Sequence, residues 1–331
     1  MNTTLELMHR PQQALACLGC LLGLLVWGGC QHYEVDVKLE SDGSGLRKVT
    51  LLDDGGWQEA STPPAAELRQ LFCVTEEQGW RPVAGPADEG EEKGDSWTAS
   101  KGFWRERRIA DLAGWYEQSG DVHIRGTLAN EDPFDQVRFS NSLAVEIGES
   151  PHGRTYNYSE TFAWAGLQDI VVDFLADHFS QAMARAYPAL GKAELAELRG
   201  LMAGHLSLGW FTMAVTDELE ENAHLIIQSL ANQVEAVVRR VEPEVDRQQV
   251  QALVEQEVLL QGDDIETYLE EKLPGFFAVG FTEVNLRVTM PGTIVETNGE
   301  RQDDHTVTWQ LDVFAAAASP VRLHVRSHVV D

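Results

Sequence analysis

The sequence predicts an α+β protein: an antiparallel, strand-rich domain formed by the N- and C-terminal parts of the chain, with an inserted or covering α-helical segment. Two observations predict this arrangement. Near both ends of the 331-residue chain, apolar and polar residues alternate, as in 33–39 and 307–313, which is typical of half-buried strands. Between residues 167 and 260, apolar residues instead recur every three or four positions, as in amphipathic helices.

The first strands are expected to form a hairpin. Residues 33–39 alternate, a cluster of Ser, Asp and Gly at 41–45 supplies a turn, and apolar character resumes over 46–52. A loop that contains Asp53-Asp54-Gly55-Gly56 and Pro63-Pro64 follows.

The rest of the first half mixes strands with short helices. A helix is predicted over 65–78 because Gly79 follows it as a typical C-terminal residue. The acidic, glycine-containing segment 85–95 is expected to be an exposed loop. Further strands are predicted at 97–107, 122–128, 137–149 and 154–164, with a short helix at 111–118.

Helical periodicity begins after Gly166. It is clearest over 217–241, where apolar residues follow one another at three- and four-residue steps on one face. Pro188 and Pro243 end two of the helices, and the short turns between them favour antiparallel neighbours in a layer or bundle. The predicted helices are 167–187, 192–208, 217–241, 247–260 and 265–272.

Strands return after Pro274-Gly275 and are expected to complete the sheet domain. Alternation marks 284–290, 307–313 and 321–325. The predicted organisation is a removed leader at 1–29, a strand-rich part with short helices at 30–164, a helical segment at 165–275 and C-terminal strands at 276–331.

The N-terminus carries the most specific functional signal. Arg10 precedes an apolar run at 14–26, and Gly28-Gly29-Cys30 follows, which is typical of a bacterial lipoprotein signal peptide. The run has 13 residues, fewer than the roughly 20 that a membrane-spanning helix needs. We therefore expect removal of the leader and attachment of acyl chains, palmitate among them, to Cys30. Trp27 is atypical of such signals, so an ordinary secretory signal or an uncleaved anchor is the alternative.

Cysteine usage is that of an envelope protein without disulfides. Cys17 and Cys20 leave with the leader, Cys30 would form a thioether to diacylglycerol, and Cys73 remains. On the apolar side of its predicted helix, Cys73 is expected to be a small buried hydrophobe rather than a reactive thiol.

The formal net charge of −28 constrains the partners. Such a surface repels phosphates, which argues against nucleic acid and against electrostatic adsorption to anionic lipid. Membrane attachment is therefore expected to come from the acyl chains on Cys30. Only two or three residues separate that cysteine from the strand at 33–39, so the domain is expected to lie close to its bilayer.

A C-terminal motif resembles the LppM-type domain of bacterial lipoproteins. It comprises Met290-Pro291-Gly292, Asn298-Gly299 and Val307-Thr308-Trp309, with Asp42-Gly43-Ser44-Gly45 as the early hairpin counterpart. The resemblance covers 30–52 and 283–330. Pro291-Gly292 is expected to turn the chain and Asn298-Gly299 to form a hairpin turn. The resemblance implies an envelope lipoprotein that binds a lipid or an envelope component.

No catalytic, cofactor-binding or metal-binding motif is present in the sequence. Asp173 and Asp177, with His178, could hold a divalent cation, although such carboxylates are more often the solvated side of a helix. His324 and His328 share one face of the last strand, where a solvent-facing pair is expected rather than a ligand pair. We expect no cofactor and no enzymatic activity. The alternative is a periplasm-facing hydrolase with a site assembled from scattered residues.

The most apolar stretch after the leader is 201–215. It is too short to span a membrane, so it forms either a buried core helix, which is the expected outcome, or a surface that meets acyl chains. If a lipid groove exists, its lining is expected at Leu206, Leu208, Trp210, Phe211 and Met213.

The predicted function is that of a membrane-anchored envelope lipoprotein that binds a lipid or another envelope protein. It should face the periplasm or the cell exterior. Gln31 follows the lipid cysteine in place of an inner-membrane retention aspartate, so the outer membrane is favoured in a Gram-negative host.

Overall fold

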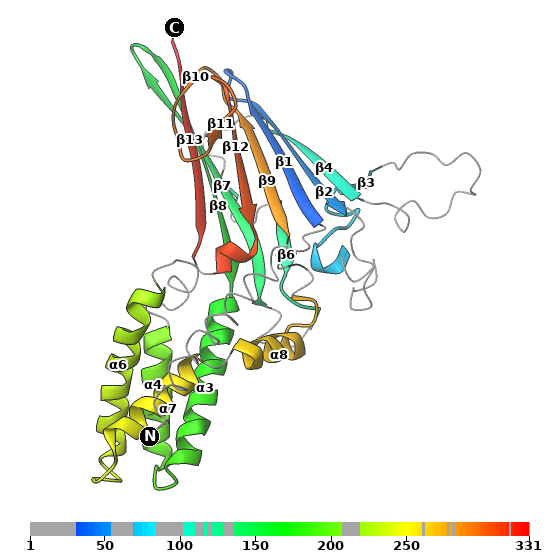
Figure 1. Cartoon of the computed structure of the whole chain (residues 1–331). Helices are drawn as coiled ribbons and strands as arrows, with labels where there is room; N and C mark the ends of the chain where they lie inside the picture. Colours follow the sequence, from blue (N-terminus) through cyan, green and yellow to red (C-terminus); the bar gives the residue numbers. More distant parts are fainter. Residues whose placement is uncertain are drawn as a thin grey trace, which may run out of the picture. The chain divides into compact units, whose positions relative to one another are not determined.

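The structure, a computed structural model, describes residues 31–53, 69–83, 102–109, 116–117, 121–128, 136–206, 219–259, 262–276, 279, 282–317 and 319–330. It divides into two compact units. A helical unit covers Gly166–Glu271, and a strand unit combines Gly28–Ala165 with Lys272–Asp331. The predicted α+β fold is confirmed, because two mostly antiparallel sheets accompany the helices (Figure 1).

The first sheet, sheet A, joins the two ends of the chain. Its neighbouring strands are antiparallel except β1 and β9, which run parallel from the His32–Glu283 pair to the Lys38–Thr289 pair. The strand order is β11-β12-β9-β1-β2-β4-β3. The strands are β1 (Gln31–Leu39), β2 (Gly45–Asp53), β3 (Arg81–Pro82), β4 (Gly102–Ile109), β9 (Glu283–Thr289), β11 (Glu300–Arg301) and β12 (Thr306–Asp312).

The second sheet, sheet B, is antiparallel throughout its described strands. Its order is β10-β13-β8-β7-β5, and β6 also pairs with β7. The strands are β5 (Tyr116–Glu117), β6 (His123–Arg125), β7 (Arg138–Ser150), β8 (Gly153–Ala165), β10 (Thr293–Thr297) and β13 (Val321–Val329).

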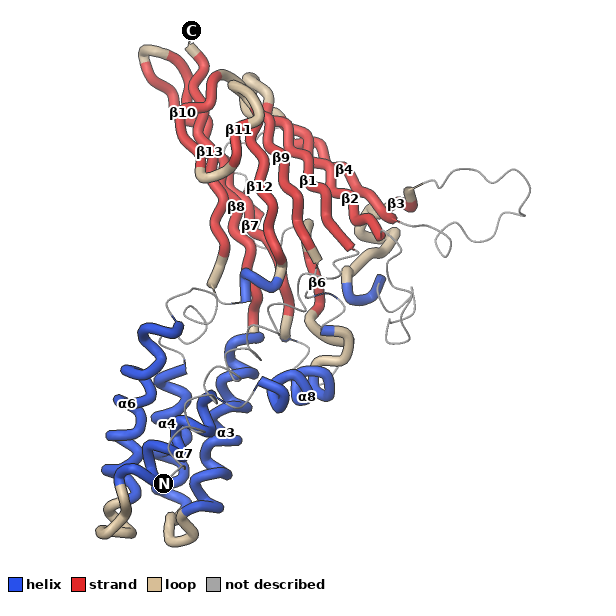
Figure 2. The backbone as a smooth tube through the Cα atoms, viewed as in Figure 1, coloured by secondary structure: helices blue, strands red, loops and turns tan. Residues whose placement is uncertain are grey.

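Period-two alternation builds a single core between the sheets, whose strands are red in Figure 2. The long strands turn most of their apolar residues inward and most of their polar residues outward, as the burial of β9 and β13 shows. Aromatic side chains fill much of this core. They include Tyr33, Phe72, Phe103, Phe139, Tyr156, Tyr158 and Phe162.

The helical unit contains α3 (Leu167–Ala186), α4 (Lys192–His205), α6 (Leu219–Val238), α7 (Arg247–Leu259) and α8 (Gly262–Lys272). Contacts link α3 to α4, α4 to α6, α6 to α7 and α7 back to α3, so these four helices close a bundle. The predicted helices in this region are confirmed to within a few residues at each end. In the described part of the chain, no helix is long and apolar enough to cross a membrane.

In the described residues, one short predicted helix ends earlier than expected and another was wrong. The helix expected over 65–78 ends at Leu71, and turns follow as far as Gly79, with Cys73 at a positive φ of 52°. In place of the helix expected over 111–118, Tyr116–Glu117 pairs with β7 as a strand. In the second segment, pairing with a neighbouring strand outweighs local propensity. The acidic segment 85–95 lies outside the described residues.

The Asn298-Gly299 dipeptide does not form the expected hairpin turn. It follows β10, which pairs with β13 in sheet B, and precedes β11, which pairs with β12 in sheet A. The dipeptide therefore carries the chain from one sheet to the other. Asn298 Oδ1 accepts hydrogen bonds from Trp309 Nε1 (3.0 Å) and His324 N (2.9 Å), while Nδ2 donates to Arg322 O (2.8 Å).

The two motif glycines are required by close packing. A Cβ on Gly299 would lie 2.4 Å from Cε2 of Trp309. At the expected Pro291-Gly292 turn, which the structure contains, Gly292 has a φ of +73° and a Cβ there would lie 2.2 Å from His328 O. The motif therefore has a structural role, because it connects the two sheets at one edge.

We expect Gly299→Ala to lower the free energy of unfolding by about 1–3 kcal/mol, because the new methyl group overpacks the Trp309 ring. Urea denaturation followed by circular dichroism measures the change. The matched control is Gly148→Ala in β7, where the nearest atom to the added Cβ, Thr155 O, would be 4.0 Å away. Equal effects of the two substitutions would contradict this account of the dipeptide.

Candidate functional site

Most of the residues singled out for lipid chemistry are not among those described. Cys30, Leu208, Trp210, Phe211 and Met213 lie outside the described residues, so their roles stay predictions. Leu206 is described at the C-terminal end of α4, where it is buried.

Two carboxylates of α3, those of Asp173 and Asp177, share one arginine as their partner. Arg199 of α4 donates Nη2 to Asp173 Oδ1 at 2.9 Å and Nε to Asp177. His178 Nε2 instead lies 3.5 Å from Glu257 of α7. These contacts hold neighbouring helices together. Across the described residues, no group of three or more His, Cys, Asp or Glu could hold a metal ion.

Cys73 is a free thiol in a turn and is only partly exposed. Burial raises the pKa of this thiol, because a thiolate is poorly solvated there. A raised pKa leaves little of the nucleophilic thiolate at neutral pH.

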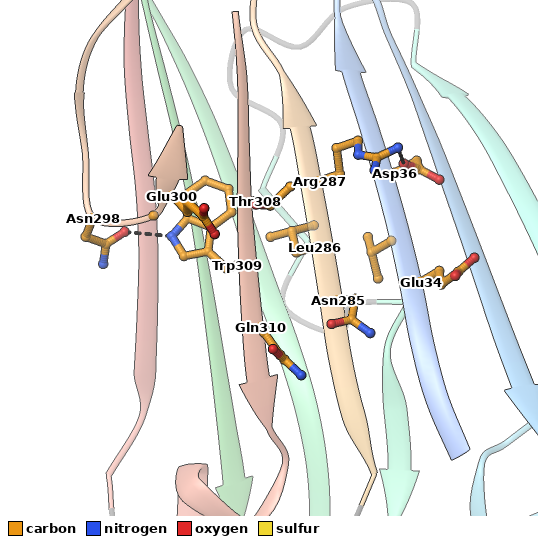
Figure 3. Close-up of a pocket in the computed structure, with 12 residues that line it drawn as sticks. Glu34, Asp36, Asn285, Leu286, Arg287, Asn298, Glu300, Thr308, Trp309 and Gln310 are labelled. Carbon is orange, nitrogen blue, oxygen red and sulfur yellow. Dashed lines mark hydrogen bonds and ion pairs between the residues drawn. The ribbon is translucent and has the colours of Figure 1, made fainter. Parts of the chain in front are cut away.

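A polar groove with a volume of about 540 Å³ lies on the outer face of sheet A (Figure 3). We call it the sheet A groove. Two rows of outward-facing side chains form its floor, because the strand register places Glu34 beside Asn285 and Gln310, and the next row follows two residues along. Asn298, Gly299 and Glu300 line it from the crossover between the sheets. The second row consists of Asp36, Arg287 and Thr308.

The sheet A groove is suited to hydrogen bonding and has an excess of negative charge. Glu34, Asp36 and Glu300 line it together with a single cation, Arg287. Arg287 Nη1 is 3.9 Å from Asp36 Oδ1, and both side chains are more than half exposed, so this ion pair adds little stability. Both partners can therefore turn toward a ligand at small cost.

Sequence reasoning did not find this groove. Alternation identifies which residues of β1, β9 and β12 face outward, but the parallel pairing of β1 with β9 brings residues about 250 positions apart into one row. A single sequence has no local signal for that pairing.

A buried ionic network connects the two sheets. Arg47 of β2 donates Nε to Asp121 Oδ2 at 2.7 Å and Nη2 to Glu160 Oε1 of β8 at 2.8 Å. Its Nη1 donates to Tyr158 OH at 3.1 Å. Asn141 and Tyr158 donate further hydrogen bonds to Glu160. The side chains of Arg47 and Glu160 are 0% exposed.

Arg47 and Asp121 of this network remain charged inside the core. Burial would lower the pKa of Arg47, but the neighbouring carboxylates of Asp121 and Glu160 raise it well above its ordinary value. Burial alone would raise the pKa of Asp121, but Arg47 brings it below its ordinary value. Because solvent does not reach these charges, the network is a structural connection rather than a site for substrate.

We expect Arg47→Met to lower the free energy of unfolding by about 3–5 kcal/mol, since it leaves the Glu160 carboxylate buried without a cation. Urea denaturation followed by circular dichroism measures this loss. Adding Asp121→Asn and Glu160→Gln to Arg47→Met should restore part of the stability. The control is Arg154→Met, which removes an exposed pair with Glu149. A loss no larger than that of the control would contradict a structural role for the buried network.

Comparison with known proteins agrees with the sequence motif. The LppM domain family matches residues 227–322, from within α6 to the start of β13. The matched segment includes α7 and α8, which the motif does not cover, and it does not reach the N-terminal hairpin. Among curated proteins, the chain has no match.

One solved structure is aligned over most of the chain: the NMR structure of the folded domain of LppM from Mycobacterium tuberculosis. It is 8% identical, and the alignment covers 92% of each chain with a TM-score of 0.27. These values are too low to indicate a shared fold. The resemblance to the LppM domain therefore rests on the family match over residues 227–322 and on the motif within it.

Proposed function

We propose that this protein is an envelope lipoprotein, anchored through acyl chains on Cys30, that binds an envelope partner through the sheet A groove. The LppM domain match supports the lipoprotein assignment, and the leader supports the anchor. The domain faces the periplasm or the cell exterior, and Gln31 favours the outer membrane in a Gram-negative host.

The position of β1 carries the proposal. The strand begins at Gln31, directly after Cys30, and Glu34 and Asp36 of the same strand line the sheet A groove. At about 3.3 Å per residue, these side chains lie about 13–20 Å along the strand from the anchor. A partner held in the groove would therefore sit beside the bilayer surface.

The lining of the groove indicates the chemistry of that partner. Amide, hydroxyl and carboxylate groups offer donors and acceptors, while an acyl chain needs contiguous apolar lining. The groove therefore favours a polar protein surface or a polar headgroup. A lipid tail would instead be expected at the predicted apolar contacts Leu206, Leu208, Trp210, Phe211 and Met213.

The one hydroxyl side chain that lines the sheet A groove is not arranged as a nucleophile. Thr308 supplies a hydroxyl to the groove, and its Oγ1 accepts a hydrogen bond from Gln302 Nε2 at 2.8 Å. A nucleophilic hydroxyl also donates to a nearby base, and among the described contacts Thr308 donates to none. This arrangement favours binding over group transfer.

We expect Cys30→Ala to release the protein from the membrane fraction and to abolish incorporation of labelled palmitate, because the acyl chains are the proposed anchor. Fractionation and palmitate labelling measure the two effects. The control is Cys73→Ala, which should leave both unchanged. Membrane retention of Cys30→Ala at the wild-type level would refute the lipid anchor.

We expect the combined substitutions Asp36→Ala, Arg287→Ala and Gln310→Ala to reduce the amount of partner bound at least tenfold, because each removes a polar contact on the groove floor. Quantitative mass spectrometry of the detergent-extracted protein measures what co-purifies. The control combines Glu106→Ala and Arg108→Ala on the exposed part of β4, outside the groove lining. Equal partner recovery with both variants would contradict binding through this groove.

A further inference from the structure

The last strand carries a row of nitrogen-bearing side chains on the outer face of sheet B. Along β13, Leu323, Val325 and Ser327 point into the core. The alternate positions therefore point outward. They are Arg322, His324, Arg326 and His328. Such a row stands out in a chain whose formal net charge is −28.

The neighbouring strand β8 places hydrogen-bonding side chains beside this row. The register pairs His324 with Ser159 and Arg326 with Asn157. On the far side of β8, Ser159 pairs with Ala144 and Asn157 with Glu146 of β7.

These side chains line a second groove, with a volume of about 300 Å³, which we call the sheet B groove. Its polar lining comes from four strands, β7, β8, β10 and β13. The polar side chains are Glu146, Asn157, Ser159, Glu296, His324 and Arg326. It shares no lining residue with the sheet A groove.

A carboxylate of the chain itself contacts both nitrogen groups. Glu296 Oε2 is 2.8 Å from Arg326 Nη2, and Glu296 Oε1 is 3.9 Å from His324 Nε2. Glu296 lies on β10, where the register with β13 shifts between Ile294 and Glu296. Its side chain is 52% exposed, so exchanging this ion pair for another anion costs little.

We propose that the sheet B groove binds a phosphate ester, with Arg326 and His324 contacting the phosphate oxygens in place of Glu296. An arginine fork matches two oxygens of a phosphate, and such charge-assisted bonds are about twice as strong as neutral ones. Ser159 and Asn157 supply neutral donors on the other side of the groove. This inference does not depend on the proposed role of the sheet A groove.

The net negative charge of the chain does not exclude such a site. At physiological ionic strength, charges more than about 8 Å apart are largely screened from each other. Contacts inside the groove therefore decide the affinity. There the phosphate takes the place of the Glu296 carboxylate beside Arg326 and His324. Glu146 remains nearby, so we expect weak affinity for simple phosphates and stronger affinity for esters whose organic part adds contacts.

Binding fits the geometry better than hydrolysis does. Ser159, His324 and Glu296 are the residue types of a hydrolase triad, but among the described contacts Ser159 makes no hydrogen bond to His324. Ser159 and His324 lie on β8 and β13, which are paired with neighbouring strands on both sides. The backbone N–H groups of these two strands are engaged in the sheet ladder and are not free to stabilise a developing oxyanion.

The test uses the full lipidated chain in non-ionic detergent and measures binding by isothermal titration calorimetry. The probes are glycerol 3-phosphate, a free phosphate ester, and dihexanoyl phosphatidylglycerol, which carries the phosphate in a lipid headgroup. We expect both to bind the wild-type chain. Arg326→Gln should weaken binding at least tenfold, whereas Glu296→Gln should strengthen it about tenfold because it removes the competing carboxylate. The control Arg108→Gln, an exposed arginine of β4, should change nothing.

A second measurement separates site loss from misfolding. Nitrogen-15 NMR of labelled histidine rings should show a His324 signal, assigned by its absence in His324→Gln, that moves on addition of either probe. Preference for the lipid probe identifies a headgroup as the source of the phosphate, and equal affinity identifies a free ester. The proposal is overturned if Arg326→Gln binds as the wild type does while its thermal unfolding is unchanged. Weaker binding by Glu296→Gln, or a His324 signal that does not respond, would overturn it as well.

Discussion

The parallel pairing of β1 with β9 is the constraint on which the strand unit depends. It joins the N-terminal hairpin to the C-terminal strands, so sheet A exists only when two distant parts of the chain meet. Loop closure costs rise only slowly with length, so a long intervening segment is tolerated. The same pairing places Glu34 and Asp36 beside Asn285 and Arg287. The sheet A groove is therefore a direct consequence of this one non-local contact.

The buried ionic network fixes how sheet A packs on sheet B. Apolar side chains can be buried in many alternative packings of two sheets. Arg47, in contrast, can satisfy its hydrogen-bond donors only where both Asp121 and Glu160 lie next to it. Charges without partners in the core are costly, so a displaced sheet would be penalised. We interpret the network as a device that selects one packing of sheet A on sheet B, with the Asn298-Gly299 crossover fixing the edge.

Local patterns in the sequence were sufficient to predict the long elements. Alternation predicted β1, β9, β12 and β13, and three- to four-residue periodicity predicted the bundle helices, because each pattern follows from one buried face. The strands β2, β7 and β8 were also predicted. The short β5 and β10 depend on a partner strand, and the order of strands depends on contacts distant in sequence. For the same reason, Asn298-Gly299 has the composition of a hairpin turn but acts as a crossover. The charged partners of Arg47 lie 74 and 113 positions away, which no periodicity reveals.

The two outer faces differ because alternation leaves outward positions free of packing demands. Inward positions of β1, β9 and β13 are mostly apolar because they fill one core, but their outward neighbours can take any charge without loss of the fold. Sheet A uses this freedom for carboxylates around Arg287, and sheet B uses it for arginines and histidines along β13. A two-layer strand unit can thus present two chemically distinct surfaces while keeping a single core. Since β1 begins next to Cys30, the anchor proposed for this chain would hold one end of sheet A at the bilayer, and the rows of both grooves would then extend away from the membrane along the strands.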